Sequence, residues 1–421
     1  MHTLRQLLFL TGFLSLAGSS QSLAQVVMPF PIGWQPSPVS SGFASTAPYS
    51  NSNISSAFRH LPTIFQWNSL RTNLDLSYLI SHEEGLPSGG RRINSSIQTI
   101  SAAAHLALGL HWSGDYTHSR TYFSNKELLA TTDDAASIKG QYNSREWAWM
   151  VVASYTFDFR NLPDTGSQTR RKIYNLEGSG STMLGTRTLL STSAAFGGRS
   201  ADVPNPSSST LQIADIQTWS ANQILSYKIT DKLDIGPSAN ETYERMDPGD
   251  DAVSYTVSAQ VNWKPSRRLV ATGSIGQKYW RYRGAAERPT KTLVYNTTAS
   301  YQLTPTTTFN AAAYQTFGPS YFSNQATDVE GWNLGLEQRL LKRFFLSVTG
   351  RKSRTTYSIP VGGVPFQRVD RADGIGASLA TPLLTRGTLS VFYSKGRNLS
   401  SDSIFTFGDN LSYGIQFAIK F

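Results

Sequence analysis

The chain has 421 residues, a formal net charge of +10 and no cysteine. Without cysteine it has no disulfides, no thiolate metal ligands and no cysteine nucleophile. Aromatic residues make up 12% of the chain and charged residues only 16%, which excludes intrinsic disorder, because disordered chains have few aromatic and many charged side chains.

The first 24 residues have the pattern of a secretory signal peptide. Arg5 provides the positive charge, residues 7–17 form an apolar run, and small residues precede a cleavage site between Ala24 and Gln25. The run is too short for a membrane-spanning helix, which takes about 20 apolar residues. Removal of this segment deletes one Arg and no acidic residue, so the mature charge is +9 (10 − 1). Export disfavours nucleic acid as a partner, and we expect the anionic neighbour to be lipopolysaccharide or an acidic polysaccharide.

Residues 25–65 are rich in proline and serine and show no sustained period. This composition predicts an extended, periplasmic N-terminal arm. Two hypotheses stay open for the arm: a flexible leader, or a plug inside a barrel.

From Leu70 onward, apolar and polar residues alternate with the period of two of half-buried β-strands. In the segment 147–159 one face carries aromatic residues at both ends and smaller apolar residues between them. Twelve residues at about 3.3 Å each, tilted by about 40°, span roughly 30 Å, close to the height of a membrane's apolar layer. Aromatic side chains prefer the two membrane interfaces. We therefore predict an aromatic girdle that includes Trp147, Trp149, Tyr155, Phe157, Phe159, Tyr255 and Trp263.

Short polar turns alternate with longer connections in the second half of the chain. Such a rhythm is typical of an outer-membrane barrel with short periplasmic turns and long extracellular loops. We count eleven strands from Trp219 onward and five before it, and we assign residues 114–144 and 82–92 to loops. The fold prediction is all-β: one antiparallel transmembrane barrel over residues 66–421 with about 16 strands, and 14 to 18 remain open.

The last strand ends the chain on an aromatic residue. Its alternating face resembles the insertion signal of bacterial outer-membrane barrels, which the barrel assembly machinery recognises. The alternative is an edge strand of a soluble sandwich. The residues of the expected signal are Tyr413, Gly414, Ile415, Phe417, Ile419 and Phe421.

The opposite, inward face of the predicted strands is dominated by hydroxyl and amide side chains. Such a wall hydrates well and can bind sugars, although the lumen of any hydrated barrel must be polar. Charged residues on this face are sparse: Asp75, Asp158, Arg187, Lys228, Lys278, Glu337 and Arg339. We expect a mild anion preference if the lumen is open.

Catalytic and metal-binding patterns are weak. We find no Ser, His and acid cluster of an outer-membrane phospholipase and no Asp-x-His pair of an omptin-type protease. The sequence 247–251 (DPGDD) could hold a divalent cation but favours a plain β-turn. We expect no catalytic residues, no metal and no cofactor.

Basic residues near the predicted loops could bind lipopolysaccharide phosphates or only hydrate the loops. They are Arg281, Arg283, Arg288, Arg351, Lys352, Arg354, Arg368 and Arg371.

Residues 215–421 resemble the β-barrel porin families often found with bacterial exopolysaccharide systems. The resemblance is carried by YQLTPTTTFNAAAYQ, EQRLLKRFFLSVTGRKS, LATPLLTRGTLSVFYSKGR and the closing NLSYGIQFAIKF. It implies an outer-membrane pore, with polysaccharide or a small hydrophilic solute as cargo, and supplies no catalytic residues. The alternatives are a closed barrel that binds or anchors surface partners, and an outer-membrane hydrolase. The oligomeric state stays open.

Overall fold

The computed structural model describes residues 66–67, 70–88, 91–108, 112–144, 146–162, 167–202, 214–283, 290–320, 325–358, 367–383, 386–401 and 408–421. The expected cleavage site at Ala24 and Gln25 and the expected arm of residues 25–65 lie outside these residues. Within the described ranges, no helix has the length and apolar character needed to cross a membrane.

The described residues form strands throughout. Their bounds are β1 (Gln66–Trp67), β2 (Leu70–Ser88), β3 (Arg91–Leu108), β4 (Trp112–Phe123), β5 (Thr131–Asn143), β6 (Trp147–Leu162), β7 (Ser167–Met183), β8 (Thr188–Asp202), β9 (Asp215–Thr230), β10 (Leu233–Asp247), β11 (Ala252–Ser266), β12 (Leu269–Tyr282), β13 (Thr290–Thr304), β14 (Thr307–Pro319), β15 (Ala326–Leu340), β16 (Phe344–Ser358), β17 (Gln367–Leu383), β18 (Gly387–Ser400) and β19 (Gly408–Lys420).

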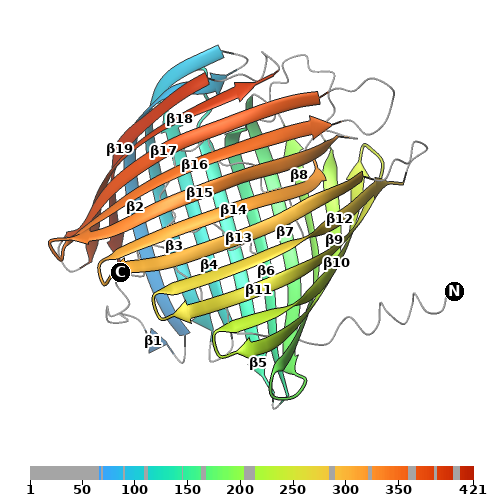
Figure 1. The fold of residues 1–421 in the computed structure, drawn as a ribbon. Helices are drawn as coiled ribbons and strands as arrows, with labels where there is room; N and C mark the ends of the chain where they lie inside the picture. The colour runs from blue at the N-terminus through green and yellow to red at the C-terminus, as the bar shows by residue number, and fades with distance from the viewer. Residues whose placement is uncertain are drawn as a thin grey trace.

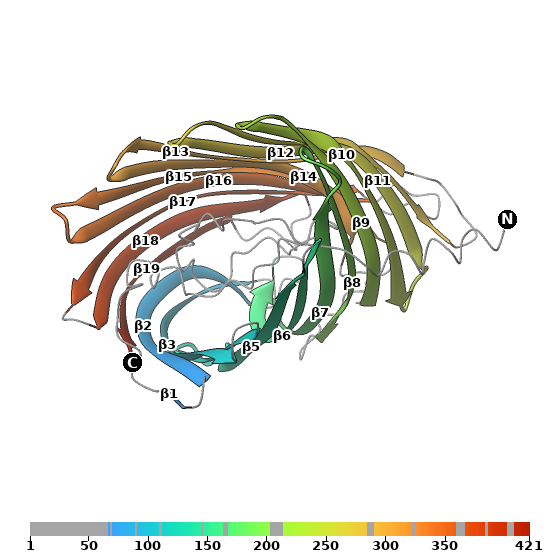
Figure 2. The same ribbon diagram turned by 90° about the horizontal axis from the view of Figure 1, so that it is seen from below.

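Each strand from β2 to β19 pairs antiparallel with its neighbours in sequence, as Figures 1 and 2 show. The last strand returns to the first, with Ile415 opposite Ile80, so the sheet closes on itself. In the part of the chain that the structure describes, the barrel wall therefore has 18 strands, and the two-residue β1 pairs only with β2. Closure removes the exposed edges that an open sheet would present.

The expected number of about 16 strands was wrong, although 18 lay at the limit of the range. Residues 114–144, which we assigned to a loop, form most of β4 and β5, and β7 was missed as well. Conversely, the segment 93–112, long enough for two strands, belongs almost entirely to the single strand β3. The reason is that β4 carries Tyr116, His118 and Arg120 on its outward face, so its alternation in hydropathy is weak, while pairing along both edges still holds it in the sheet.

The connections differ between the two rims of the barrel. At one rim, here called the short rim, eight connections of two to four residues join the strands. At the other, here called the long rim, connections reach twelve residues, between β8 and β9. Three long-rim connections are short as well. The β6–β7 and β10–β11 connections have four residues each, and only residues 89–90 separate β2 from β3, where we expected a loop over 82–92. The chain end lies at the short rim, where Phe421 N donates to Leu74 O at 2.8 Å.

The wall is a single layer, so alternate residues face outward and inward. On β11, the outward side chains of Tyr255, Val257 and Trp263 are 45%, 60% and 46% exposed. The inward neighbours Thr256 and Ser258 are buried. The apolar outer face and the polar inner face are thus the reverse of the arrangement in a soluble protein, as a membrane-spanning barrel requires.

Candidate functional site

The aromatic residues predicted for the girdle lie on the outward face of β6 and β11. Tyr155, Tyr255 and Trp263 are exposed, and Trp147, Trp149 and Phe157 are partly exposed. Phe159 differs, because it is only 5% exposed and the guanidinium of Arg170 covers its ring at 5.2 Å. Phe159 therefore contributes little surface to a girdle.

The outward aromatic side chains recur at a constant spacing along several strands. Eight residues separate the members of four pairs: Trp147 and Tyr155, Trp219 and Tyr227, Tyr255 and Trp263, and Tyr413 and Phe421. Eight residues extend about 26 Å along a strand and, at a tilt of about 40°, roughly 20 Å along the barrel axis. This height fits between the two interfaces of an outer membrane, whose apolar band on such barrels is about 25 Å tall.

The row nearer the long rim is continuous over at least four strands. Cross-strand ring contacts join Tyr174 to Phe196 at 5.7 Å, Phe196 to Trp219 at 5.2 Å, and Trp219 to Tyr243 at 5.4 Å. We call the outward aromatic side chains at this level the upper row.

The predicted insertion-signal residues lie on β19 and close the barrel. Tyr413, Ile415, Phe417 and Phe421 are exposed on the outward face, and Ile419 is partly exposed. Gly414 lies on the other face. An added Cβ there would meet the carbonyl oxygen of Ile80 at 2.4 Å, so this side of the seam requires glycine.

Two of the predicted inward charges are buried in the wall. Asp158 pairs with Arg171, whose Nε donates to Oδ1 at 2.7 Å, and both side chains are almost fully buried. Lys278 is 5% exposed. Asp75 and Glu337 are partly exposed on the inward face.

The other three predicted charges lie at the short rim. Lys228 forms an ion pair with Asp231 of the adjoining turn at 2.9 Å. Arg339 donates to the carbonyl of Lys342 at 2.8 Å. Arg187 lies in the turn between β7 and β8, and its expected place on the wall was wrong. The expectation failed because β7 ends at Met183 and β8 begins only at Thr188.

Near the long rim, β14 separates from β13 and bends toward the lumen, but it stays in the sheet through β15, which is paired with β16 up to Ala326 and Ser358. The pairing of β13 with β14 ends at Tyr295 and Gln315, whereas β14 stays paired with β15 up to Pro319 and Ala326. Beyond Gln315, the ring of Phe317 lies 5.4 Å from that of Trp280 on β12, edge to face. We call residues 316–320 and 325–328 the β14–β15 tip.

Two cations from other strands hold the tip by its backbone. Lys278 Nζ on β12 donates to the carbonyl oxygen of Phe317 at 2.7 Å. Arg199 on β8 donates to the carbonyl oxygens of Pro319 and Ser320 at 3.0 and 2.7 Å. Since β8 and β14 are far apart around the wall, these bonds reach across part of the lumen.

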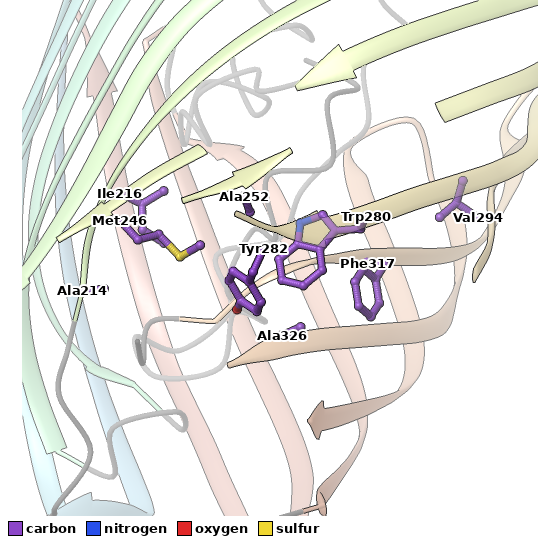
Figure 3. Packing of buried hydrophobic residues seen from close by; sticks show 9 residues of the cluster. All are labelled: Ala214, Ile216, Met246, Ala252, Trp280, Tyr282, Val294, Phe317 and Ala326. Atoms are coloured by element: carbon purple, nitrogen blue, oxygen red, sulfur yellow. The ribbon is translucent and has the colours of Figure 1, made fainter. Parts of the chain in front are cut away.

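The tip packs into an apolar cluster on the inner face of the barrel. The residues come from seven strands, β9 to β15, and from Ala214 just before β9, and Figure 3 shows Trp280 between Tyr282 and Phe317. The members are Ala214, Ile216, Met246, Ala252, Trp280, Tyr282, Val294, Phe317 and Ala326.

A carboxylate is enclosed beside this cluster. Glu244 is 1% exposed, and its Oε2 accepts a hydrogen bond from Trp280 Nε1 at 3.4 Å. Its charge interacts with those of Lys278 and Arg199. A buried carboxylate needs such cations, because desolvation without compensation is costly.

Burial of the inner face increases from the short rim to the long rim. On β10, Asp234 is partly exposed, whereas Ser238, Asn240, Thr242, Glu244 and Met246 are all buried. On β12, Thr272 is exposed and Ser274 partly so, whereas Lys278, Trp280 and Tyr282 are buried. The lumen is therefore accessible from the short rim and filled near the long rim on this side of the barrel. We call the filled region the constriction.

A serine, a histidine and an acid do meet on the inner face of β3, β4 and β5. His105 Nδ1 and Asp115 Oδ1 are 2.5 Å apart, and Ser137 Oγ donates to Asp115 Oδ2 at 3.3 Å. The order is wrong for nucleophilic catalysis, because the serine hydroxyl donates its hydrogen bond to the carboxylate and the imidazole does not lie between them. Within the described ranges, no group of three or more His, Asp or Glu side chains could hold a metal ion.

Sequence reasoning missed Arg199, Glu244, Trp280 and Tyr282 as members of the constriction. A signal was present in 279–282 (YWRY), where aromatic residues occupy the inward as well as the outward positions of one strand end. Aromatic residues on both faces indicate that the inner face is covered there.

No protein-family model and no curated protein matches the chain. Solved structures resemble it weakly. OccK2 (OpdF) of Pseudomonas aeruginosa has a TM-score of 0.48 and 12% identity, with 83% of this chain and 98% of that chain covered. The outer membrane protein opdK of the same organism has a TM-score of 0.45 and 10% identity, with the same coverage. The siderophore receptor PirA from Acinetobacter baumannii has a TM-score of 0.43 and 6% identity, with 83% and 80% covered.

With TM-scores below 0.5, these likenesses assign neither a family nor a solute. The architecture itself, a closed antiparallel barrel with an apolar outer face and a polar inner face, is that of an outer-membrane β-barrel.

Proposed function

We propose that the protein is a channel of the bacterial outer membrane for small hydrophilic solutes. The observation that carries the proposal is the burial of the polar inner face. Its side chains are exposed to the lumen near the short rim and are buried at the constriction near the long rim. Two aromatic rows about 20 Å apart surround this face and match the membrane interfaces. No catalytic step belongs to the proposal.

The orientation follows from the rims. Short turns of outer-membrane barrels face the periplasm, and long loops face the outside. The chain end at Phe421 lies at the short rim. The constriction would then lie near the extracellular mouth, and a solute from outside would meet it first.

In this channel the β14–β15 tip acts as a gate. Arg199 and Lys278 bind the tip through backbone carbonyl oxygens. Hydrogen bonds from charged donors contribute about 1.5–3 kcal/mol each, enough to favour the closed position while allowing brief openings. Loss of one donor should shift the gate toward the open position.

The test is single-channel recording in planar bilayers. Arg199→Met should raise the unit conductance or the open fraction relative to the wild type. Arg339→Met is the matched control, because Arg339 also donates to a backbone carbonyl, but within a turn at the short rim. Its conductance should equal that of the wild type.

Two results would contradict the proposal. If Arg199→Met and Arg339→Met behave alike, the tip is not a gate. If the wild type and Arg199→Met are both inserted but never conduct, the barrel is closed, which favours the surface-binding alternative.

Polysaccharide as cargo rests on the resemblance of residues 215–421 to porins found with exopolysaccharide systems and on the hydroxyl-rich inner face. Liposome swelling with oligosaccharides of increasing length separates the two cargoes. Uptake that stops at disaccharides would exclude a polymer conduit.

A further inference from the structure

The outward face of β16, β17 and β18 carries a group of cations just beyond the upper aromatic row. These strands lie side by side in the wall, in orange to red in Figure 1. The exposed cations are Lys352, Arg354, Arg371, Lys395 and Arg397. We call them the basic patch. Arg351 and Arg368, which we grouped with them from the sequence, have the opposite parity on their strands and face inward.

The strand register sets the height of the patch. Tyr393 and Tyr413 are opposite each other in the upper row. Lys395 and Arg397 follow Tyr393 on the same face, two and four residues closer to the long rim. Four residues correspond to about 13 Å along the strand and roughly 10 Å along the barrel axis. The cations therefore lie at the depth of lipid headgroups, whereas Val391, two residues from Tyr393 toward the short rim on the same face, is exposed in the apolar zone.

Two arginines of the patch are direct cross-strand partners. Arg354 on β16 is opposite Arg371 on β17. Like charges in this position are destabilising, with Cβ atoms about 5 Å apart. An anion between the two guanidinium groups would remove this repulsion.

Carboxylates lie beside the cations of the basic patch, but they do not neutralise its positive charge completely. Arg354 Nη1 lies 3.5 Å from Glu330 Oε1, and Arg397 Nε lies 3.5 Å from Asp409 Oδ1. Asp373 is opposite Lys352 and Arg397 in the register. Asp328 on β15 also interacts with Arg354. Five cations therefore face four carboxylates among the described residues of this sector, which leaves a surplus of one positive charge. Each arginine keeps N–H donors for a further acceptor, because a guanidinium has five.

We propose that the basic patch binds the phosphate groups of a lipopolysaccharide-type lipid in the outer leaflet. Arginine side chains bind phosphate oxygens in bidentate geometry, and Lys352 and Lys395 add point charges at the edge. The acyl chains would lie against the exposed apolar side chains below the upper row. This inference rests on the proposed outer-membrane orientation, but not on the channel being open.

The test measures binding of purified lipid A to the detergent-solubilised full-length protein by native mass spectrometry. The patch variant combines Lys352→Gln, Arg371→Gln and Arg397→Gln. The matched control combines Lys232→Gln, Arg267→Gln and Arg268→Gln, three exposed cations of short-rim turns. Bisphosphorylated lipid A should bind the wild type and the control equally, and the patch variant roughly 100-fold more weakly, since each basic residue at an anionic membrane surface contributes on the order of fivefold.

Dephosphorylated lipid A separates headgroup recognition from acyl-chain contact. It should bind all three proteins equally and weakly. Equal binding of bisphosphorylated lipid A by the wild type and the patch variant would overturn the proposal, as would equal affinity of the wild type for both lipids. Displacement of lipid A by millimolar inorganic phosphate alone would show a free-anion site and overturn it too. The patch variant should conduct like the wild type, so failure here is distinguishable from failure of the channel proposal.

Discussion

Ala259 is the residue at which the membrane register can be tested most directly. It lies on the outward face of β11, four residues from Tyr255 and four from Trp263. Each step of four residues corresponds to roughly 10 Å along the barrel axis. Ala259 therefore lies at mid-depth, and its cross-strand neighbours are Pro237 and Ile275, which offer no counter-charge.

We expect Ala259→Arg to reduce the free energy of unfolding by about 2–4 kcal/mol, the cost of an arginine at the midplane of the lipid face. Gln260→Arg is the matched control on the adjacent, inward position, where the neighbours are Gly236 and Ser274. Gln260 is only partly buried, so a long side chain there can extend toward the lumen, and the cost should be below about 1 kcal/mol.

Ser258 would be a poor control. It is 7% exposed and hydrogen-bonded to Ser238 Oγ at 2.6 Å. It also lies against Gly276, where an added Cβ would approach Ser258 Cβ to 2.3 Å. An arginine would be overpacked there for reasons unrelated to lipid.

The measurement is guanidinium-induced unfolding in phospholipid vesicles, followed by tryptophan fluorescence. The same linear-extrapolation slope for the wild type and both variants is required before the free energies are compared. Equal costs at positions 259 and 260, or a larger cost at 260, would refute the assignment of faces and with it the membrane register.

Three further predictions concern charges. Arg171→Met should cost about 3–5 kcal/mol in unfolding free energy, because it removes the cation paired with the buried Asp158, and adding Asp158→Asn should recover much of it. The hydrogen bond from Lys228 lowers the pKa of Asp231 in the β9–β10 turn, so this contact stabilises above the ordinary carboxyl pKa and is lost as the pH falls through the lowered value. An NMR titration of Lys228→Met should show the Asp231 pKa returning upward, and an unchanged pKa would contradict the contact. With a formal net charge of +10, the reversal potential in a KCl gradient should show a mild anion preference that fades with salt, and a clear cation preference would argue against it.

The membrane-facing pattern could be predicted from the sequence because it is local. Side chains alternate with period two along any strand, so Tyr255 and Trp263 could be placed on one face and Thr256 on the other without knowledge of their neighbours. The same holds for the closing strand, where the alternation runs from Tyr413 to Phe421. The alternation of short polar turns with longer connections after Trp219 is also a local pattern. All eleven strands that we expected from Trp219 onward are present.

The strand number could not be settled in the first half, because pairing depends on neighbours. Strand β4 presents Tyr116, His118 and Arg120 outward, and no hydropathy pattern separates such a segment from a polar loop. Its place in the wall is decided by backbone hydrogen bonds to β3 and β5, which residue types do not encode.

The hydrogen bonds that hold the constriction together were decided by the tertiary structure alone. Arg199 reaches carbonyl oxygens 120 and 121 residues further along the chain, and Lys278 reaches one 39 residues away. The acceptors are backbone carbonyl oxygens, which every residue has. The residue types at positions 317, 319 and 320 therefore could not predict these hydrogen bonds. The sequence by itself determined which face of each regular strand meets lipid, because that depends on a local period. The departure of β14 from β13 beyond Gln315, the seat of Phe317 on Trp280 and the enclosure of Glu244 depend on how distant strands meet around a closed wall, which only the folded barrel decides.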